Sequence, residues 1–126
     1  MPLLGRFNAK FIRCNNYDEK KRIFGVDWPP MAHTMIGIRG LDNLQHCVVE
    51  VIKNNIPGDL IETGVWRGGA TIFMRAILKA YKVTDRKVWV ADSFEGLPMP
   101  DEIRYRQDKG DQHHRIEFYS GSLVVA

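Results

Sequence analysis

The spacing of apolar residues predicts a long helix in the first half of the chain. Apolar side chains recur there at steps of three and four residues, which is the period of one helix face. Thr34 is a suitable N-cap, and Pro57-Gly58 cannot continue a helix, so we expect the helix over about residues 34–54. Its apolar face would consist of Ile38, Leu41, Leu44, Val48 and Val51.

A strand, a glycine-rich turn, a second helix and a second strand are predicted next. Residues 59–63 form a short strand, and residues 64–69, Gly-Val-Trp-Arg-Gly-Gly, form the turn. Residues 70–81 have the pattern of an amphipathic helix, and the apolar run at residues 88–91 fits a strand buried on both faces of a parallel sheet. This order defines a βαβ unit. The apolar side of its helix would consist of Ile72, Phe73, Ala76, Ile77 and Ala80.

The remaining segments lack a regular pattern. Residues 1–32 have mixed charge and contain Pro29-Pro30, which cannot lie inside a helix, so we expect an irregular lead-in or flap. Residues 33–126 would form the N-terminal part of one domain. Residues 101–115 are strongly polar, and residues 123–126 begin an apolar run at which the sequence stops. We therefore expect a domain that is truncated at its C-terminus.

Composition favours a folded globular protein and disfavours a nucleic-acid partner. Charged residues make up 26% of the 126 residues, and the formal net charge is +3, which argues against disorder. The small basic excess includes the run Lys20-Lys21-Arg22, but no aromatic-interleaved basic stripe follows it. We expect a solvated surface there, and a nucleic-acid-binding module is the weakest alternative.

Cysteine usage and hydropathy predict a cytoplasmic protein without a membrane partner. Cys14 and Cys47 lack a CxxC spacing, so both are expected to be free thiols in a reducing compartment. No stretch reaches the roughly 18 apolar residues that a membrane span requires. The N-terminus also lacks the sustained apolar region of a leader peptide.

Acidic residues and glycines gather where a βαβ unit binds ligands. Glu62 lies at the end of the first predicted strand, and Asp92 follows the second. Gly64, Gly68 and Gly69 lie in the turn into the helix. Open α/β sheets bind ligands beyond the carboxyl ends of their strands, and glycine allows the backbone to pass close to a ligand. The Asp92 carboxylate is therefore a candidate acceptor for the two hydroxyls of a ribose.

The glycine turn favours S-adenosylmethionine over a dinucleotide. A dinucleotide fingerprint reads G-x-G-x-x-G, and its second glycine lets the pyrophosphate approach the backbone. The chain has Trp66 at that position. S-adenosylmethionine has no phosphate and does not need this glycine, and its ammonium group suits a nearby carboxylate. A nicotinamide-dependent oxidoreductase fragment remains an alternative, which Trp66 disfavours.

Three separated blocks are specific enough to suggest a family. They are residues 57–70 (Pro-Gly-Asp-Leu-Ile-Glu-Thr-Gly-Val-Trp-Arg-Gly-Gly-Ala), residues 88–98 (Val-Trp-Val-Ala-Asp-Ser-Phe-Glu-Gly-Leu-Pro), and residues 34–37 with 41–45. In this order they resemble the macrocin O-methyltransferase (TylF-like) family of S-adenosylmethionine-dependent methyltransferases. The resemblance implies a Rossmann-like α/β fold, of which the N-terminal helix and the first βαβ unit are present. It also implies methyl transfer to a hydroxyl, in the namesake a sugar hydroxyl of a macrolide.

The resemblance further implies roles for individual residues. The methionine end of the cofactor would be lined by Glu62, Thr63 and Gly64, and the ribose would be held by Asp92 beside Ser93. Thr34 and Met35 would close over the cofactor from the first helix. With these and the turn glycines, the predicted cofactor site comprises Thr34, Met35, Glu62, Thr63, Gly64, Gly68, Gly69, Asp92 and Ser93.

The catalytic base and the metal ligands are not identified by the sequence. The family implies magnesium, but its aspartates belong to a later block that these residues lack, so no metal ligand is assigned. A hydroxyl acceptor must lose its proton, which requires a general base or a metal. A solvated loop is the simpler interpretation of residues 101–115, whose polar candidates are Asp101, Glu102, Asp108, Asp111, His113 and His114.

The expected partner is a small hydroxylated acceptor, with a sugar as one class. Two strands cannot by themselves form a parallel sheet covered on both faces, so a non-catalytic truncated fragment is the main alternative. Exposed sheet edges favour association, which makes a homo-oligomer a further expectation. Fold analogy supplies a reaction class and leaves the acceptor open.

Overall fold

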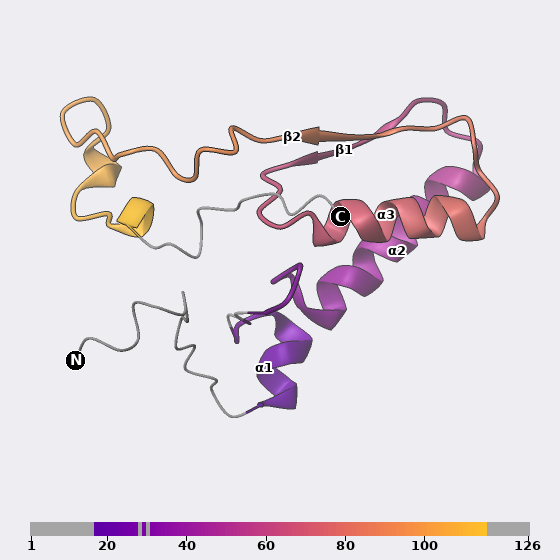
Figure 1. Ribbon diagram of the computed structural model, residues 1–126, viewed down its shortest axis with the longest axis horizontal. Helices are drawn as coiled ribbons and strands as arrows, with labels where there is room; N and C mark the ends of the chain where they lie inside the picture. Colours follow the sequence, from indigo (N-terminus) through magenta and orange to yellow (C-terminus); the bar gives the residue numbers. More distant parts are fainter. Residues whose placement is uncertain (1–16, 28, 30, 116–126) are drawn as a thin grey trace, which may run out of the picture.

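The computed structural model describes residues 17–27, 29 and 31–115 as a short α/β unit (Figure 1). Helices and strands alternate after an initial pair of helices. In chain order the elements are α1 (Glu19–Phe24), α2 (Gly37–Lys53), β1 (Leu60–Thr63), α3 (Gly69–Ala80), β2 (Val88–Ala91) and two 3-10 turns, η2 (Arg106–Asp108) and η3 (His113–Arg115).

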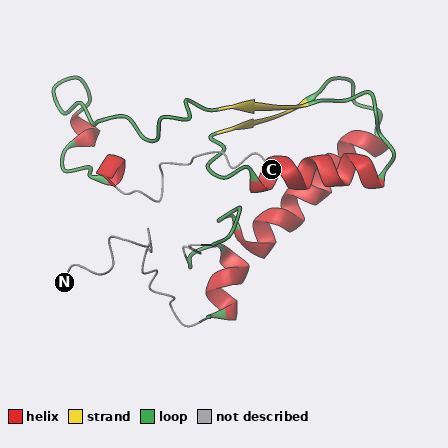
Figure 2. Ribbon diagram, viewed as in Figure 1, coloured by secondary structure: helices red, strands yellow, loops and turns green. Residues whose placement is uncertain are grey.

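The two strands are parallel neighbours, which confirms the predicted βαβ unit. Leu60 pairs with Val88 and Thr63 pairs with Ala91 at the two ends of the register. Both long helices lie on one side of these strands (Figure 2). The carboxyl ends of β1 and β2 therefore meet at one edge of the sheet, beside the glycine turn that enters α3.

The core lies between the strands and the two long helices. Leu78 of α3 is fully buried, and Leu60 and Val88 pack against the cluster from the strands. The other face of the sheet is open in this part of the chain, where Ile61 is 62% exposed and Trp89 is 52% exposed. The expectation that residues 88–91 are buried on both faces is therefore wrong for the described residues. The buried cluster consists of Val48, Val49, Met74, Ile77 and Leu78.

Helix α2 begins three residues later than predicted. Its N-cap is Ile36, which makes no side-chain cap hydrogen bond, so the assignment of Thr34 as N-cap is wrong. The Thr34 hydroxyl instead accepts a hydrogen bond from the Ile36 N–H at 3.4 Å, within the turn before the helix. The buried face also differs, because Val49 is buried while Ile38 is exposed. Helix α2 packs on both α1 and α3, so its buried residues do not follow a single straight stripe.

Helix α3 has the predicted length but buries a neighbouring stripe. Ala70, Met74, Ile77 and Leu78 are buried, at the i, i+4, i+7 and i+8 positions of one helix face. Ile72, expected on the core side, is 60% exposed. The helix carries apolar residues on two adjacent stripes, and contact with α2 and the sheet selects one of them.

Helix α1 was not expected, because residues 1–32 were predicted to be irregular. Asp18 caps it by accepting the Lys21 N–H at 3.1 Å, and Gly25 ends it in a left-handed conformation with φ of 70°. The helix buries no residue of its own, so the sequence has no buried apolar stripe from which it could be predicted. The predictions for residues 1–16 and for the final apolar run lie outside the described residues. In the part of the chain that is described, no helix is long and apolar enough to cross a membrane.

Candidate functional site

The turn between β1 and α3 depends on backbone conformations that favour glycine. Gly64 has φ of 79° and Gly68 has φ of 76°, and Gly68 is the N-cap of α3. The Gly64 N–H donates to the Ala91 carbonyl at 3.0 Å, which extends the strand pairing into the turn. A Cβ placed on Gly64 would meet no atom within 4 Å. The backbone at Gly64 is therefore open on the side where a side chain would project.

Asp92 ties the end of β2 to this turn. Its Oδ2 accepts the Val65 N–H at 2.6 Å, and its Oδ1 accepts the Phe94 N–H at 2.9 Å. Hydrogen bonds from these amides hold the pKa of the Asp92 carboxyl below its ordinary value, and the bond from Phe94 has the largest effect. Asp92 is therefore ionised at neutral pH, and its carboxylate accepts backbone N–H groups from both the turn after β1 and the loop after β2.

Glu62 is held on the helix side of the sheet. Its carboxylate accepts a hydrogen bond from the hydroxyl of Thr71, in the first turn of α3. Thr71 was not among the predicted site residues. The sequence pattern that could have identified Thr71 is a hydroxyl residue in the first turn of the helix that follows Glu62. The pair brings a carboxylate to the N-terminal end of α3, where the helix dipole stabilises negative charge.

A strap formed by residues 32–36 crosses the start of α3. The Gly69 N–H donates to the His33 carbonyl at 2.9 Å, and Arg67 Nη1 donates to the Ala32 carbonyl at 3.3 Å. A Cβ on Gly69 would lie 2.4 Å from the His33 oxygen and 2.7 Å from Thr34 Cβ. Gly69 is thus required by the passage of the strap. Arg67 is partly exposed, and its side chain holds the strap.

The other predicted cofactor residues occupy the same region. Thr63 pairs with Ala91 at the last register position of the sheet, and Met35 lies in the strap beside Thr34. Ser93 shapes the loop after β2, because its hydroxyl accepts the Glu95 N–H at 3.3 Å and donates to the Gly96 carbonyl at 3.4 Å. The structure thus brings the nine predicted residues to two strand ends, the turn and the strap.

The polar loop that supplied base and metal candidates lies away from this edge (Figure 1). Its acidic residues bond within the loop, as where Asp108 accepts the Asp101 N–H at 2.9 Å. Asp111 accepts the His113 N–H at 2.7 Å, and this amide and the His113 ring lower the pKa of the Asp111 carboxyl. Among the described residues, no three His, Cys, Asp or Glu side chains are grouped to hold a metal ion. These residues do not fit a magnesium site.

The fold and the site together define a class of protein. A strand, a glycine turn, a helix and a parallel strand place one carboxylate at the end of β1 and another after β2. This arrangement is the first βαβ unit of a Rossmann-like α/β domain, a fold in which ligands bind beyond the carboxyl ends of the strands.

Comparison with known proteins then identifies the family. The family profile of macrocin O-methyltransferase (TylF) matches residues 3–124. The chain therefore belongs to the macrocin O-methyltransferase family, which confirms the resemblance inferred from the three sequence blocks.

Two curated relatives and one solved structure are similar over most of this chain. It is 50% identical over 115 residues to 8-demethyl-8-(2,3-dimethoxy-alpha-L-rhamnosyl)-tetracenomycin-C 4'-O-methyltransferase of Streptomyces olivaceus, covering 91% of this chain and 43% of the relative. It is 57% identical over 103 residues to demethyldecarbamoylnovobiocin O-methyltransferase of Streptomyces niveus, covering 82% and 39%. The structure of the O-methyltransferase NovP matches with a TM-score of 0.79 and 55% identity, covering 84% of this chain and 44% of that chain. The chain thus spans less than half the length of these relatives.

Proposed function

We propose that this chain carries the S-adenosylmethionine-binding part of an enzyme that methylates a hydroxyl of a small natural product. The observation that carries the proposal is the pair of fixed carboxylates, Glu62 and Asp92, on either side of the open backbone at Gly64. Family membership supports the reaction class, because the relatives are named as O-methyltransferases.

The chemistry of these groups fits the two polar ends of S-adenosylmethionine. Ribose hydroxyls would donate to the ionised carboxylate of Asp92, and Glu62 would supply negative charge for the ammonium of the methionine end. Gly64 would let the cofactor lie against the backbone between them. The bound cofactor would supply a methyl group on a sulfonium, which is already an activated donor.

The proposed contacts follow from the position of each residue around this edge. Thr63 would line the methionine end with Gly64, and Ser93 would adjoin the ribose. Thr34 and Met35 would close over the cofactor from the strap. Gly68 and Gly69 would act indirectly. Gly68 is the N-cap of α3, and the missing side chain of Gly69 lets the strap pass close to the helix.

Asp92 would have two roles in this arrangement. It would position the ribose, and it would hold the turn by accepting the Val65 N–H. Positioning accounts for much of the barrier reduction in a displacement between two bound groups, about 7–11 kcal/mol in favourable cases. The proposed contribution of this part of the chain is the orientation of the methyl donor.

The acceptor is proposed to be a sugar hydroxyl of a glycosylated natural product. One relative is named for a 4'-oxygen on a compound with a rhamnosyl group. A further relative, 62% identical over 80 residues, covering 64% of this chain and 32% of the relative, is mycinamicin III 3''-O-methyltransferase of Micromonospora griseorubida. No step of the proposed reaction involves magnesium, because the described residues do not fit a magnesium site. We also propose a cytoplasmic location, to which the exposed free thiol of Cys47 is suited.

A transfer assay tests this proposal. S-adenosylmethionine labelled in its methyl group is incubated with the chain and a panel of rhamnosyl-bearing aromatic glycosides, and labelled product is measured. We expect label in a sugar ether, and less of it with Asp92→Asn than with Asp59→Asn, a change at the opposite end of the sheet. Binding of the donor without any transfer would support the alternative of a cofactor-binding chain that is not catalytic.

A further inference from the structure

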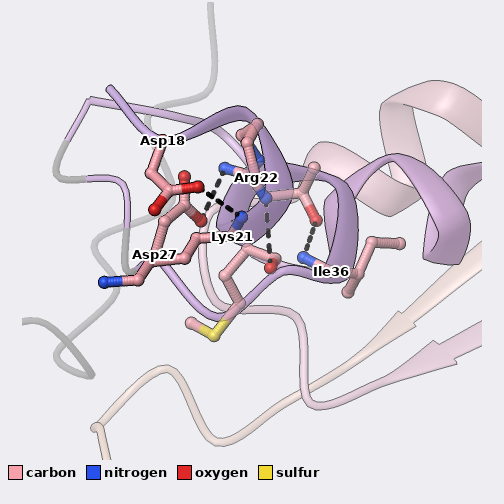
Figure 3. Close-up of polar contacts among 7 residues, drawn as sticks. Asp18, Lys21, Arg22, Asp27 and Ile36 are labelled. Atoms are coloured by element: carbon pink, nitrogen blue, oxygen red, sulfur yellow. Dashed lines mark hydrogen bonds and ion pairs between the residues drawn. The ribbon is translucent and has the colours of Figure 1, made fainter. Parts of the chain in front are cut away.

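Arg22 joins three segments that meet at the start of α2 (Figure 3). Its Nη1 lies 3.4 Å from the Asp27 Oδ1, and its Nη2 donates to the Met35 carbonyl at 3.3 Å. The two charged side chains are 18% and 19% exposed, so solvent screens this pair less than a surface pair. One guanidinium therefore connects α1, the turn after it and the strap.

The backbone at this junction is in direct contact. A Cβ on Gly37 would lie 2.4 Å from the Gly25 nitrogen, and a Cβ on Gly25 would lie 2.6 Å from the Met35 oxygen. Both glycines have positive φ, 74° and 70°. The end of α1 and the start of α2 thus fit together only without side chains at these positions, and Arg22 adds a side-chain contact from α1 to the segment before α2.

The strap is held from both sides. Arg67 and the Gly69 N–H hold the Ala32 and His33 carbonyls from the glycine turn, and Arg22 holds the Met35 carbonyl from α1. Thr34 lies between these attachment points. Release of the Met35 carbonyl would free the strap on the α1 side, while its attachment to the turn would remain.

We propose that Arg22 is a positioning residue for cofactor binding, which fixes Thr34 and Met35 over the cofactor by holding the Met35 carbonyl. The inference rests on the proposed function, in which these two residues close over S-adenosylmethionine. Arg22 itself would not touch the cofactor. Its effect is to pre-organise the strap, so that less conformational freedom is lost when the cofactor binds.

Two measurements on the chain test this role. Calorimetric titration gives the affinity for S-adenosylmethionine, and amide hydrogen exchange without cofactor gives the protection of the Gly69 N–H, which is bonded to the strap. With Arg22→Met we expect about tenfold weaker binding, the size of a lost charge-assisted hydrogen bond, and faster exchange at Gly69. Protection of Leu78 in the core should not change. Arg22→Lys keeps the charge beside Asp27 and should fall between Arg22→Met and the unaltered chain.

The matched control is Lys20→Met, which removes one positive charge from the exposed side of the same helix. It should leave both measurements unchanged. The proposal is overturned if Arg22→Met binds as the unaltered chain does, or if both variants weaken binding equally. If Arg22→Met also loses protection at Leu78, its core is disturbed and the affinity of Arg22→Lys is the deciding measurement. Unchanged affinity of Arg22→Lys for S-adenosylmethionine would then overturn the proposal. If the unaltered chain does not bind S-adenosylmethionine, the proposed function fails, while exchange at Gly69 still decides whether Arg22 fixes the strap.

Discussion

The Val65 N–H donates to the Asp92 Oδ2 at 2.6 Å, across 27 positions of sequence. This bond joins the glycine turn after β1 to the end of β2, so that the carboxylate proposed for the ribose also shapes the turn. A similar arrangement exists at the other end of the sheet. There Asp59 accepts the Lys87 N–H at 2.9 Å and the Trp89 Nε1–H at 2.7 Å. The two aspartates bracket the strand pair, which makes each a natural control for the other.

Acid should destabilise the chain partly through Asp92. Its pKa is held below the ordinary value in the folded state, so the charged form stabilises the fold at neutral pH. That contribution is present above the ordinary pKa and is lost as the pH falls through the lowered pKa. We expect the urea midpoint of the unaltered chain to fall more between pH 7 and pH 3 than that of Asp92→Asn. An equal fall in both would mean that the Asp92 carboxyl has an ordinary pKa.

Gly64→Ala should impair cofactor binding more than it impairs stability. The new Cβ meets no atom within 4 Å but requires φ near 79°, a backbone cost of about 1–2 kcal/mol. Gly110→Ala is the matched control, because Gly110 has φ of 81° and equally open space in the distant polar loop. Urea unfolding should give similar losses for the two variants. S-adenosylmethionine titration should separate them, and equal affinities would argue against a cofactor at Gly64.

Gly69→Ala should displace the strap. Its Cβ would lie 2.4 Å from the His33 oxygen, a contact that only movement of the backbone can relieve. We expect a loss of about 1–3 kcal/mol in the free energy of unfolding, the usual range for overpacking. Amide exchange at Ile36 and at position 69 should become faster. Retention of the original stability and protection would show that the strap does not rest on this residue.

Alanine substitutions at Leu78 and Ile72 should differ sharply in their effect on the free energy of unfolding, although both are aliphatic residues of α3. Leu78 is fully buried, so Leu78→Ala should reduce the free energy of unfolding by about 2–5 kcal/mol. Ile72 lies on the exposed stripe, and Ile72→Ala should change it by no more than about 0.5 kcal/mol. Urea denaturation of the two variants checks the assignment of the helix faces. The reverse order would mean that the sequence-based assignment of Ile72 to the core was correct.

Sequence reasoning predicted the βαβ unit because its signals are local. Short apolar runs, a glycine turn and a periodic helix placed β1 and α3 within a residue of their observed bounds and gave β2 its full range. The choice between adjacent stripes of α3 needed the packing partners, so Met74 was missed and Ile72 was wrongly included.

The polar contacts of the site were less accessible to sequence reasoning. Arg22 reaches a carbonyl 13 residues away and Arg67 reaches one 35 residues away, so neither contact has a local pattern. Helix α1 was missed for a related reason, since it buries none of its own residues and is fixed by the junction of Gly25 with Gly37. The placement of Glu62 and Asp92 at one edge was predictable, because the carboxyl ends of neighbouring parallel strands share an edge.

Calorimetric titration of S-adenosylmethionine into the unaltered chain, Asp92→Asn and Asp59→Asn is the sharpest test of the proposed cofactor site. We expect saturable binding to the unaltered chain and to Asp59→Asn, and binding to Asp92→Asn that is weaker by about tenfold or more, since hydrogen bonds to a charged group are lost. Circular dichroism on the same samples would confirm that all three are folded. No binding by a well-folded unaltered chain, or equal weakening by both substitutions, would contradict the claim that the edge beyond Glu62 and Asp92 binds this cofactor.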